Sequence, residues 1–140
     1  MPNSQSDIFV RVVRNDLPLK ERLLPKAFAK RMDMLAEEGV NRAKILIQNS
    51  PADGITYDRG GYSHTASSPG QPPRSDTGRL INGLHWQPRG QDRLVIASGS
   101  YPAYLEFGTT KMEPRPFMGP MARQLQQLIR PTFDKILEDD

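Results

Sequence analysis

The feature that most constrains the fold is a long amphipathic stretch at residues 25–48. Its apolar residues recur at steps of three and four, the period of one helix face: Phe28, Met32, Leu35, Ala36, Val40, Ala43 and Ile47. Pro25 suits the first helical turn, where a missing N–H costs nothing. The charged residues between them have mixed signs, which is typical of a solvated opposite face: Lys26, Lys30, Asp33, Glu37 and Arg42. The remaining chain must therefore supply elements against which this apolar face can pack.

A second amphipathic stretch, at residues 118–137, predicts a C-terminal helix. Its apolar face is made by Met121, Leu125, Leu128, Ile129, Phe133, Ile136 and Leu137. Pro120 fits the first turn of this helix, and Pro131 predicts a kink. The end of the chain carries Glu138, Asp139 and Asp140, where the helix dipole disfavours negative charge, so we expect this end to fray.

Short segments rich in β-branched and aromatic residues predict a small sheet. Residues 8–14 predict a first strand, after which residues 15–19 turn the chain. Residues 80–87 and 93–98 predict two further strands, which are joined across Pro-Arg-Gly-Gln-Asp. A turn at residues 76–78 precedes them, and residues 101–107 form a third short candidate in this region. The connections are too short for crossovers, which predicts antiparallel pairing.

The segment at residues 50–75 is rich in Gly, Pro, Ser and Asp and has no sustained period. It predicts a long central loop, with room for a loose hairpin. Loops of this length inside a small domain are uncommon and usually functional, which makes this one a candidate interaction arm. Together the elements predict an α+β fold, with a small antiparallel sheet packed against a long helix and a C-terminal helix. The 140 residues suit one domain, residues 1–140.

The composition argues against several classes of protein. There are no cysteines, so disulfides and thiolate chemistry are absent and stability must come from packing or association. No apolar run is long enough to span a bilayer, and the first seven residues do not resemble a secretory signal, so we expect a cytosolic location. The net charge of +3 is weak support for nucleic-acid binding.

The sequence offers little for catalysis or for a cofactor. His64 and His85 are the only histidines, and a zinc site would need further ligands such as Asp58 or Asp76. The glycines lack the spacing of a phosphate-binding loop. Four arginines around the central loop and the following strands could touch phosphate: Arg74, Arg79, Arg89 and Arg93. Aspartates lie among them in the sequence, which reduces the local positive charge. We therefore predict no enzyme activity, no cofactor and no metal, and keep a small nucleic-acid-binding protein as the alternative from another class.

The segment "YLEFGTTKMEPRPFMGP" at residues 104–120 is densely specified yet contains no histidine, cysteine or serine. Glu106 and Arg115 are either a solvated pair or hold a turn onto which a neighbouring subunit docks. Phe107 and Phe117 could anchor that contact, and core packing of Phe117 stays open. The second reading predicts that Glu106→Ala or Arg115→Ala changes assembly more than folding. The predicted interface residues are Tyr104, Glu106, Phe107, Gly108, Thr109, Arg115, Pro116 and Phe117.

Two segments, residues 67–84 and 101–125, resemble in order and spacing the tail-completion or head-tail joining proteins of lambdoid long-tailed bacteriophages, the "gene ten" tail-component family. The matching residues are Asp76, Thr77, Gly78, Arg79 and Leu80, then Tyr104, Glu106, Phe107, Gly108 and Thr109, then Met112, Arg115, Pro116 and Phe117. The chain departs from the family pattern at Pro114, where a small residue is usual, at Gly119, where a basic residue is common, and at Asn82-Gly83.

The resemblance implies a structural α+β subunit without enzyme activity. It implies a homo-oligomeric ring, a hexamer or dodecamer, in the phage neck between the head-tail connector and the tail terminator or tail tube. The protein would be in the host cytoplasm during assembly and then in the neck or tail of the virion, with non-specific contact with passing phage DNA and none with a membrane. A tail terminator that caps the tail tube is the related alternative.

Overall fold

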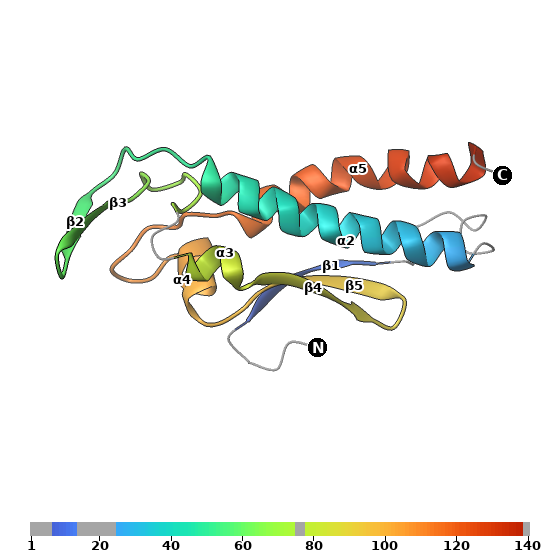
Figure 1. The fold of residues 1–140 in the computed structure, drawn as a ribbon, viewed down its shortest axis with the longest axis horizontal. Coiled ribbons are helices and arrows are strands. Elements are labelled where there is room, and N and C mark those ends of the chain that lie inside the picture. The colour runs from blue at the N-terminus through green and yellow to red at the C-terminus, as the bar shows by residue number, and fades with distance from the viewer. Residues whose placement is uncertain (1–6, 14–24, 75–77, 139–140) are drawn as a thin grey trace.

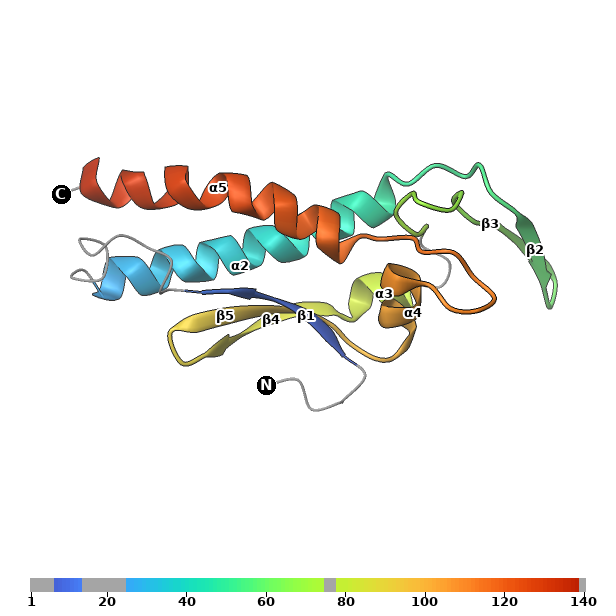
Figure 2. The same ribbon diagram turned by 180° about the vertical axis from the view of Figure 1, so that it is seen from behind.

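The computed structural model describes residues 7–13, 25–74 and 78–138, and the fold is α+β, as predicted (Figure 1). Its elements in chain order are β1 (Ile8–Val12), α2 (Pro25–Gln48), β2 (Thr56–Arg59), β3 (Tyr62–Thr65), α3 (Arg79–Asn82), β4 (Leu84–Arg89), β5 (Asp92–Ala97), α4 (Tyr101–Phe107) and α5 (Met118–Glu138). Helices α2 and α5 lie side by side and run in opposite directions, above the sheet formed by β1, β4 and β5 (Figures 1 and 2). The turn predicted at residues 15–19 falls outside the described residues, as do residues 76 and 77 of the turn predicted at residues 76–78 and residues 139 and 140 of the end predicted to fray at residues 138–140.

The three-stranded sheet has the order β1-β5-β4, and both pairings are antiparallel, which confirms the predicted direction. Val95 in the central strand pairs with Val10 on one side and with Trp86 on the other. The turn between β4 and β5 needs only Gly90 and Gln91, since Arg89 already pairs with Asp92. A tight turn of this kind favours glycine, and Gly90 has a φ of 59°.

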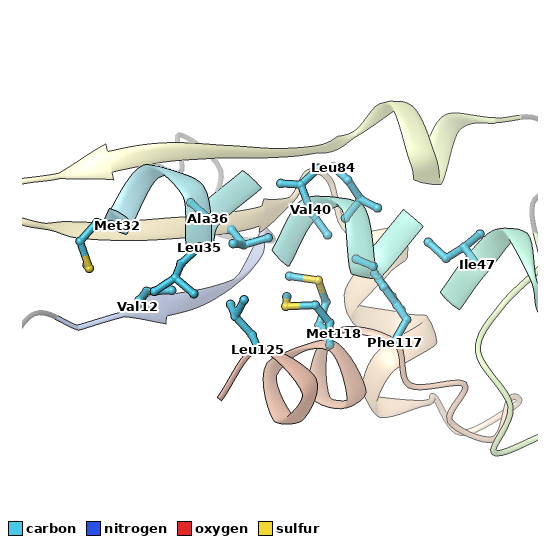
Figure 3. Close-up of a cluster of buried hydrophobic side chains, with 14 of the residues drawn as sticks. Val12, Met32, Leu35, Ala36, Val40, Ile47, Leu84, Phe117, Met118 and Leu125 are labelled. Atoms are coloured by element: carbon cyan, nitrogen blue, oxygen red, sulfur yellow. The ribbon is translucent and has the colours of Figure 1, made fainter. Parts of the chain in front are cut away.

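The core lies between the sheet and the two long helices (Figure 3). All seven apolar residues predicted for the long helix are buried: Phe28, Met32, Leu35, Ala36, Val40, Ala43 and Ile47. From α5, Met121 and Leu125 are buried as predicted. Gly39 allows these layers to approach closely, because a Cβ there would lie 3.0 Å from Val95 Cγ2 and 3.2 Å from Leu125 Cδ2. The helix continues through Pro131 to Glu138.

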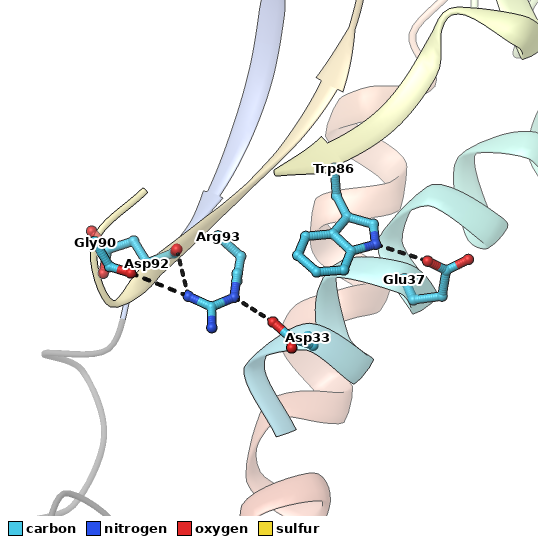
Figure 4. A network of polar contacts seen from close by, with 6 residues as sticks. All are labelled: Asp33, Glu37, Trp86, Gly90, Asp92 and Arg93. Atoms are coloured by element: carbon cyan, nitrogen blue, oxygen red, sulfur yellow. Dashed lines mark hydrogen bonds and ion pairs between the residues drawn. The ribbon is translucent and has the colours of Figure 1, made fainter. Parts of the chain in front are cut away.

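The sequence pattern suggested that the polar face of α2 is solvated. In the structure, part of this face instead binds the sheet (Figure 4). Arg93 of β5 is 7% exposed and donates from Nε to Asp33 Oδ1 at 2.6 Å. The same guanidinium donates to the carbonyl of Asp92 at 2.9 Å. Trp86 of β4 donates from its indole nitrogen to Glu37 Oε2 at 2.8 Å. These two side-chain contacts orient the sheet on the helix.

The prediction of a strand at residues 101–107 is wrong, because this segment forms helix α4 (Tyr101–Phe107). An alternating pattern would place Tyr101 and Phe107 on a buried face, yet they are 57% and 72% exposed. The buried residues are instead Pro102 and Leu105, three positions apart, which is a helical step. Pro102 lies in the first turn, where a proline is well tolerated.

The strand predicted at residues 80–87 begins later than expected. Helix α3 occupies residues 79–82, and β4 starts at Leu84. Gly78, before α3, has a φ of 82° and allows the chain to turn into this short helix. The first strand, β1, ends at Val12, whereas the predicted strand continued to residue 14, which lies outside the described residues.

The central loop contains the hairpin for which the sequence left room. β2 and β3 pair in register from Thr56 with Thr65 to Arg59 with Tyr62, around a Gly60-Gly61 turn with φ values of 50° and 104°. The hairpin extends beyond the end of α2 as an arm, separate from the three-stranded sheet (Figures 1 and 2). None of the helices in the described ranges has the length and apolar character needed to cross a membrane.

Candidate functional site

Glu106, a predicted interface residue, binds the start of α5 within its own chain. Its carboxylate accepts hydrogen bonds from the backbone N–H groups of Phe117 at 2.7 Å, Met118 at 3.0 Å and Gly119 at 2.8 Å. The first N–H groups of a helix have no partner within the helix, and the helix dipole favours a negative charge there. Glu106 therefore caps α5 from α4, eleven residues earlier in the chain.

Arg115 also has its partners within the chain, and Glu106 is not among them. Its Nε donates to the carbonyl of Ser67 at 3.1 Å, and its backbone N–H donates to the carbonyl of Leu105 at 2.6 Å. Gly70 donates from its backbone to the carbonyl of Pro114 at 2.9 Å. The segment before α5 is thus fastened both to α4 and to the base of the central loop. Glu106 and Arg115 are therefore not a solvated pair within one chain, since each holds the segment before α5 through other partners, and the docking of a neighbouring subunit onto this segment stays a prediction.

Gly108 makes the turn that follows α4. Its φ is 77°, and its N–H donates to the carbonyl of Tyr104 at 2.8 Å. A Cβ at this position would lie 2.9 Å from both the Met112 carbonyl oxygen and Pro114 Cδ. Only glycine suits this combination of backbone conformation and close approach.

The eight predicted interface residues separate into an inner and an outer group. Phe117 is fully buried and belongs to the core, while Glu106 and Arg115 fix the backbone. Tyr104 and Phe107 are 51% and 72% exposed. The other three lie in the segment that joins α4 to α5, residues 108–117, which we call the connecting segment. Thr109 is exposed there, and Gly108 and Pro116 are half-buried. The exposed aromatic side chains are therefore the part of the motif that a partner could contact.

Further large apolar side chains are exposed on the neighbouring arm and on the start of α4. They are Ile55, Tyr57, Tyr62 and Tyr101. With Tyr104 and Phe107 they lie at the end of the molecule that carries α3, α4 and the hairpin (Figures 1 and 2). The sequence predicted that the central loop at residues 50–75 is an interaction arm, but it did not indicate which apolar residues of the loop would be exposed.

A cleft of about 840 Å³ lies between the arm, α3 and α4. Three arginines line it, Arg74, Arg79 and Arg115, together with His64 from β3. Its apolar lining includes Tyr101 of α4. Sequence reasoning noted Arg74 and Arg79 as possible phosphate contacts but did not bring them together with Arg115. In the described parts of the chain, no cluster of three or more histidine or carboxylate side chains is placed to hold a metal ion.

The base of the arm is closed by short polar contacts. Asp53 Oδ1 accepts from the Ser68 backbone N–H at 2.9 Å, and the Ser68 hydroxyl donates to the Asp53 carbonyl at 3.1 Å. The hydrogen bond from the Ser68 backbone is the main cause that holds the pKa of Asp53 below its usual 3.8. The contact therefore stabilises the arm at neutral pH, and this contribution is lost as the pH falls below 3.8 through the lowered pKa.

We expect Gly54→Ala to loosen the base of the arm. The added Cβ would lie 2.4 Å from the Ser67 carbonyl oxygen and 2.9 Å from that of Ala66, both of which are backbone atoms that cannot move aside cheaply. The substitution should destabilise the arm by about 1–3 kcal/mol, with faster amide hydrogen exchange in residues 54–66 than in the core. Gln71→Ala is the control, because Gln71 is an exposed residue just outside the arm. Equal exchange in the two variants would contradict the close-approach argument.

Comparison of the chain with protein-family models, with curated proteins and with solved structures found no match.

Proposed function

We propose that the chain is a structural subunit of a phage or prophage neck, which completes the tail or joins the head to the tail and assembles as a ring. The proposal combines the ordered motifs at residues 76–80 and 104–117 with the surface that they help to build. In this function the chain performs no catalysis, and its surface serves subunit contacts. Its partners are further copies of itself, the connector, and the tail terminator or tail tube.

The exposed apolar end of the molecule is the observation that carries the proposal. Tyr57 and Tyr62 on the arm are 44% and 49% exposed, and Ile55 at its base is 64% exposed. An isolated two-stranded hairpin is only marginally stable in water, so an arm of this kind gains order when a neighbour covers it. Exposed apolar side chains that gather in one region of a protein surface commonly mark an interaction site. The arrangement supports a subunit whose arm and α4 pack against another protein.

The rigid attachment of this end also supports a repeated contact. The Glu106 cap and the Arg115 contacts hold α4, the connecting segment and the base of the arm in one arrangement. Preorganised surfaces lose less conformational entropy on binding. A heterologous contact repeated around an axis closes into a ring when the rotation between subunits permits it.

The mass of the purified protein tests this proposal. We expect sedimentation or light scattering to give a defined multiple of the 15.8 kDa chain, and negative-stain images to show closed rings. In a phage or prophage that carries this gene, its deletion should leave filled heads and tails unjoined. A protein that stays monomeric at high concentration, together with infectious particles after the deletion, would contradict the proposal.

The position of the ring is tested separately. Tails purified without heads should lack the protein if it joins the two, whereas a terminator that caps the tail tube would be found on them. Salt-sensitive DNA binding by the monomer, with a steep dependence on ionic strength, would instead favour a nucleic-acid-binding protein.

A further inference from the structure

The arm has one open edge. Its two strands, β2 and β3, pair only with each other among the described residues, so each strand has an outer side. The outer side of β3 is partly occupied, because Arg74 Nη1 donates to the Thr65 carbonyl at 2.7 Å. Residues 55–58 are all exposed, whereas residues 64–66, which face them, are half-buried. The open edge of the arm is therefore the outer side of β2.

The backbone of β2 points hydrogen-bonding groups outward at two residues. The Ile55 carbonyl accepts from the Ala66 N–H at 2.9 Å, so it points toward the β3 side of the arm. Successive residues of an antiparallel strand alternate in this direction, which leaves the N–H and C=O groups of Thr56 and Asp58 on the outer side. In the described ranges these backbone groups have no protein partner. An edge with unpaired donors and acceptors is a template for one more strand.

The three-stranded sheet, by contrast, protects its edge strand β4 with a proline. Arg89 and Asp92 close the two-residue turn to β5, so Pro88 lies at a position whose backbone points away from β5. Proline has no N–H there, which weakens the pairing of a further strand. β2 contains no proline, and its Asp58 carboxylate already accepts from the Ser63 hydroxyl at 2.7 Å within the arm. The β2 edge therefore lacks the protection that β4 has.

The β2 edge is complementary to the same edge of a second copy. Two β2 strands related by a two-fold axis at Tyr57 run antiparallel and place the outward groups of Thr56 opposite those of Asp58, on both sides of the axis. Each such pair exchanges backbone hydrogen bonds that a single chain leaves unmade. The two Tyr57 side chains face each other, and aromatic cross-strand pairs are favourable. The Asp58 carboxylates face Thr56, so no like charges lie directly opposite each other.

We propose that the arms of two copies pair along β2 around a two-fold axis at Tyr57, which joins the two hairpins into one continuous sheet. The arm extends beyond the end of α2, so the pairing edge lies clear of the three-stranded sheet and the long helices (Figures 1 and 2). A lone two-stranded hairpin is marginally stable in water, and added strands stabilise it. This contact is isologous, whereas a ring closes through heterologous contacts, so the pairing goes beyond the proposed ring and does not depend on it.

An engineered disulfide tests the pairing directly, because the chain has no cysteine of its own. In the two-fold arrangement the Tyr57 positions of the two copies lie opposite each other, within the separation that a disulfide spans. We expect Tyr57→Cys to form a covalent dimer under mild oxidation. Ser63→Cys is the matched control, since Ser63 is exposed on the opposite edge of the same arm, about 14 Å or three strand spacings from its counterpart. Equal cross-linking of the two variants would overturn the proposal.

Substitutions at Thr56 separate the pairing of two arms from the folding of one arm. Thr56→Pro removes an N–H that points away from β3, so β2 can still pair with β3. In a chain that also carries Tyr57→Cys, we expect Thr56→Pro to slow dimer formation by at least about tenfold, with unchanged amide exchange in residues 62–65. Thr56→Asp should also weaken the dimer, because it places like charges opposite Asp58, and Thr56→Lys should strengthen it. Cross-linking that none of these substitutions changes would contradict the proposed register.

Failure of the arm pairing and failure of the ring give different results. If the wild type forms rings but Tyr57→Cys does not cross-link, the two-fold pairing fails and the proposed function stands. If Tyr57→Cys cross-links in a chain that forms no ring, the pairing stands and the ring proposal fails. If Thr56→Pro disperses an assembly in which Tyr57→Cys forms no disulfide, β2 pairs with a different strand and the two-fold contact is overturned.

Discussion

Replacing Phe117 with alanine is expected to lower the free energy of unfolding by about 3–5 kcal/mol, the usual cost of truncating a fully buried phenylalanine. Phe117 has no exposed surface and lies in the core beside Met118 at the start of α5 (Figure 3). Truncation removes its contacts and leaves a cavity that the neighbouring backbone, fixed by Glu106 and Arg115, cannot easily fill. Thermal or urea unfolding of the purified chain measures the effect, with an expected fall in Tm of roughly 10–20 °C.

Phe107→Ala is the matched control, because the same side chain is lost from a position that is 72% exposed. We expect its unfolding free energy to change by less than about 0.5 kcal/mol. If Phe107 contacts a neighbouring subunit, the same substitution should reduce the assembled fraction at a given concentration. A large loss of stability in Phe107→Ala, or none in Phe117→Ala, would contradict the division of the motif into an outer and an inner aromatic residue.

The long helices could be predicted from the sequence because each buries one continuous face. The positions at steps of three and four in residues 25–48 determine the helix without knowledge of its partners, and every one of them is buried. The same holds for Met121 and Leu125 of α5. The strand pattern of residues 93–98 was equally informative, since Val95 and Ala97 face the helices.

The secondary structure of short segments was harder to predict, because a few residues can fit both the strand period and the helix period. In residues 101–107 the alternation of Tyr101, Ala103, Leu105 and Phe107 fits a strand, but the step from Pro102 to Leu105 fits a helix, and tertiary burial decides between them. The start of β4 was missed for a related reason. Leu80 and Ile81 look like strand residues, yet they are only partly buried and lie in the single turn of α3.

The site itself depends on contacts between residues that are distant in the sequence. The cleft brings Arg74 and Arg115 together, and no local pattern predicts that approach. A signal for the Glu106 cap was present, however, because residues 115–118 contain no Ser, Thr, Asp or Asn to cap α5 locally. A helix start without a local cap requires an acceptor from elsewhere, and Glu106 is the one acid in α4.

Replacing Glu106 with alanine should destabilise the folded monomer by about 2–3 kcal/mol, which reverses the expectation from the sequence that assembly would change more than folding. The substitution removes the acceptor of three backbone hydrogen bonds at 2.7–3.0 Å and the charge that complements the α5 dipole. Glu106→Gln keeps one acceptor oxygen without the charge, so we expect a smaller loss of about 1 kcal/mol. Urea unfolding at a concentration too low for assembly measures the monomer alone.

Glu113→Ala provides the matched control, since Glu113 is an exposed acid of the same segment, and its unfolding free energy should change by less than about 0.5 kcal/mol. Assembly of Glu106→Ala should fall only as far as the loss of folded monomer requires, because the carboxylate is already occupied by its own chain. If Glu106→Ala instead unfolds like the wild type and fails to assemble, the carboxylate must bind a neighbouring subunit. The Tyr104–Pro120 segment would then make its contact through Glu106 as well as through its exposed aromatic residues.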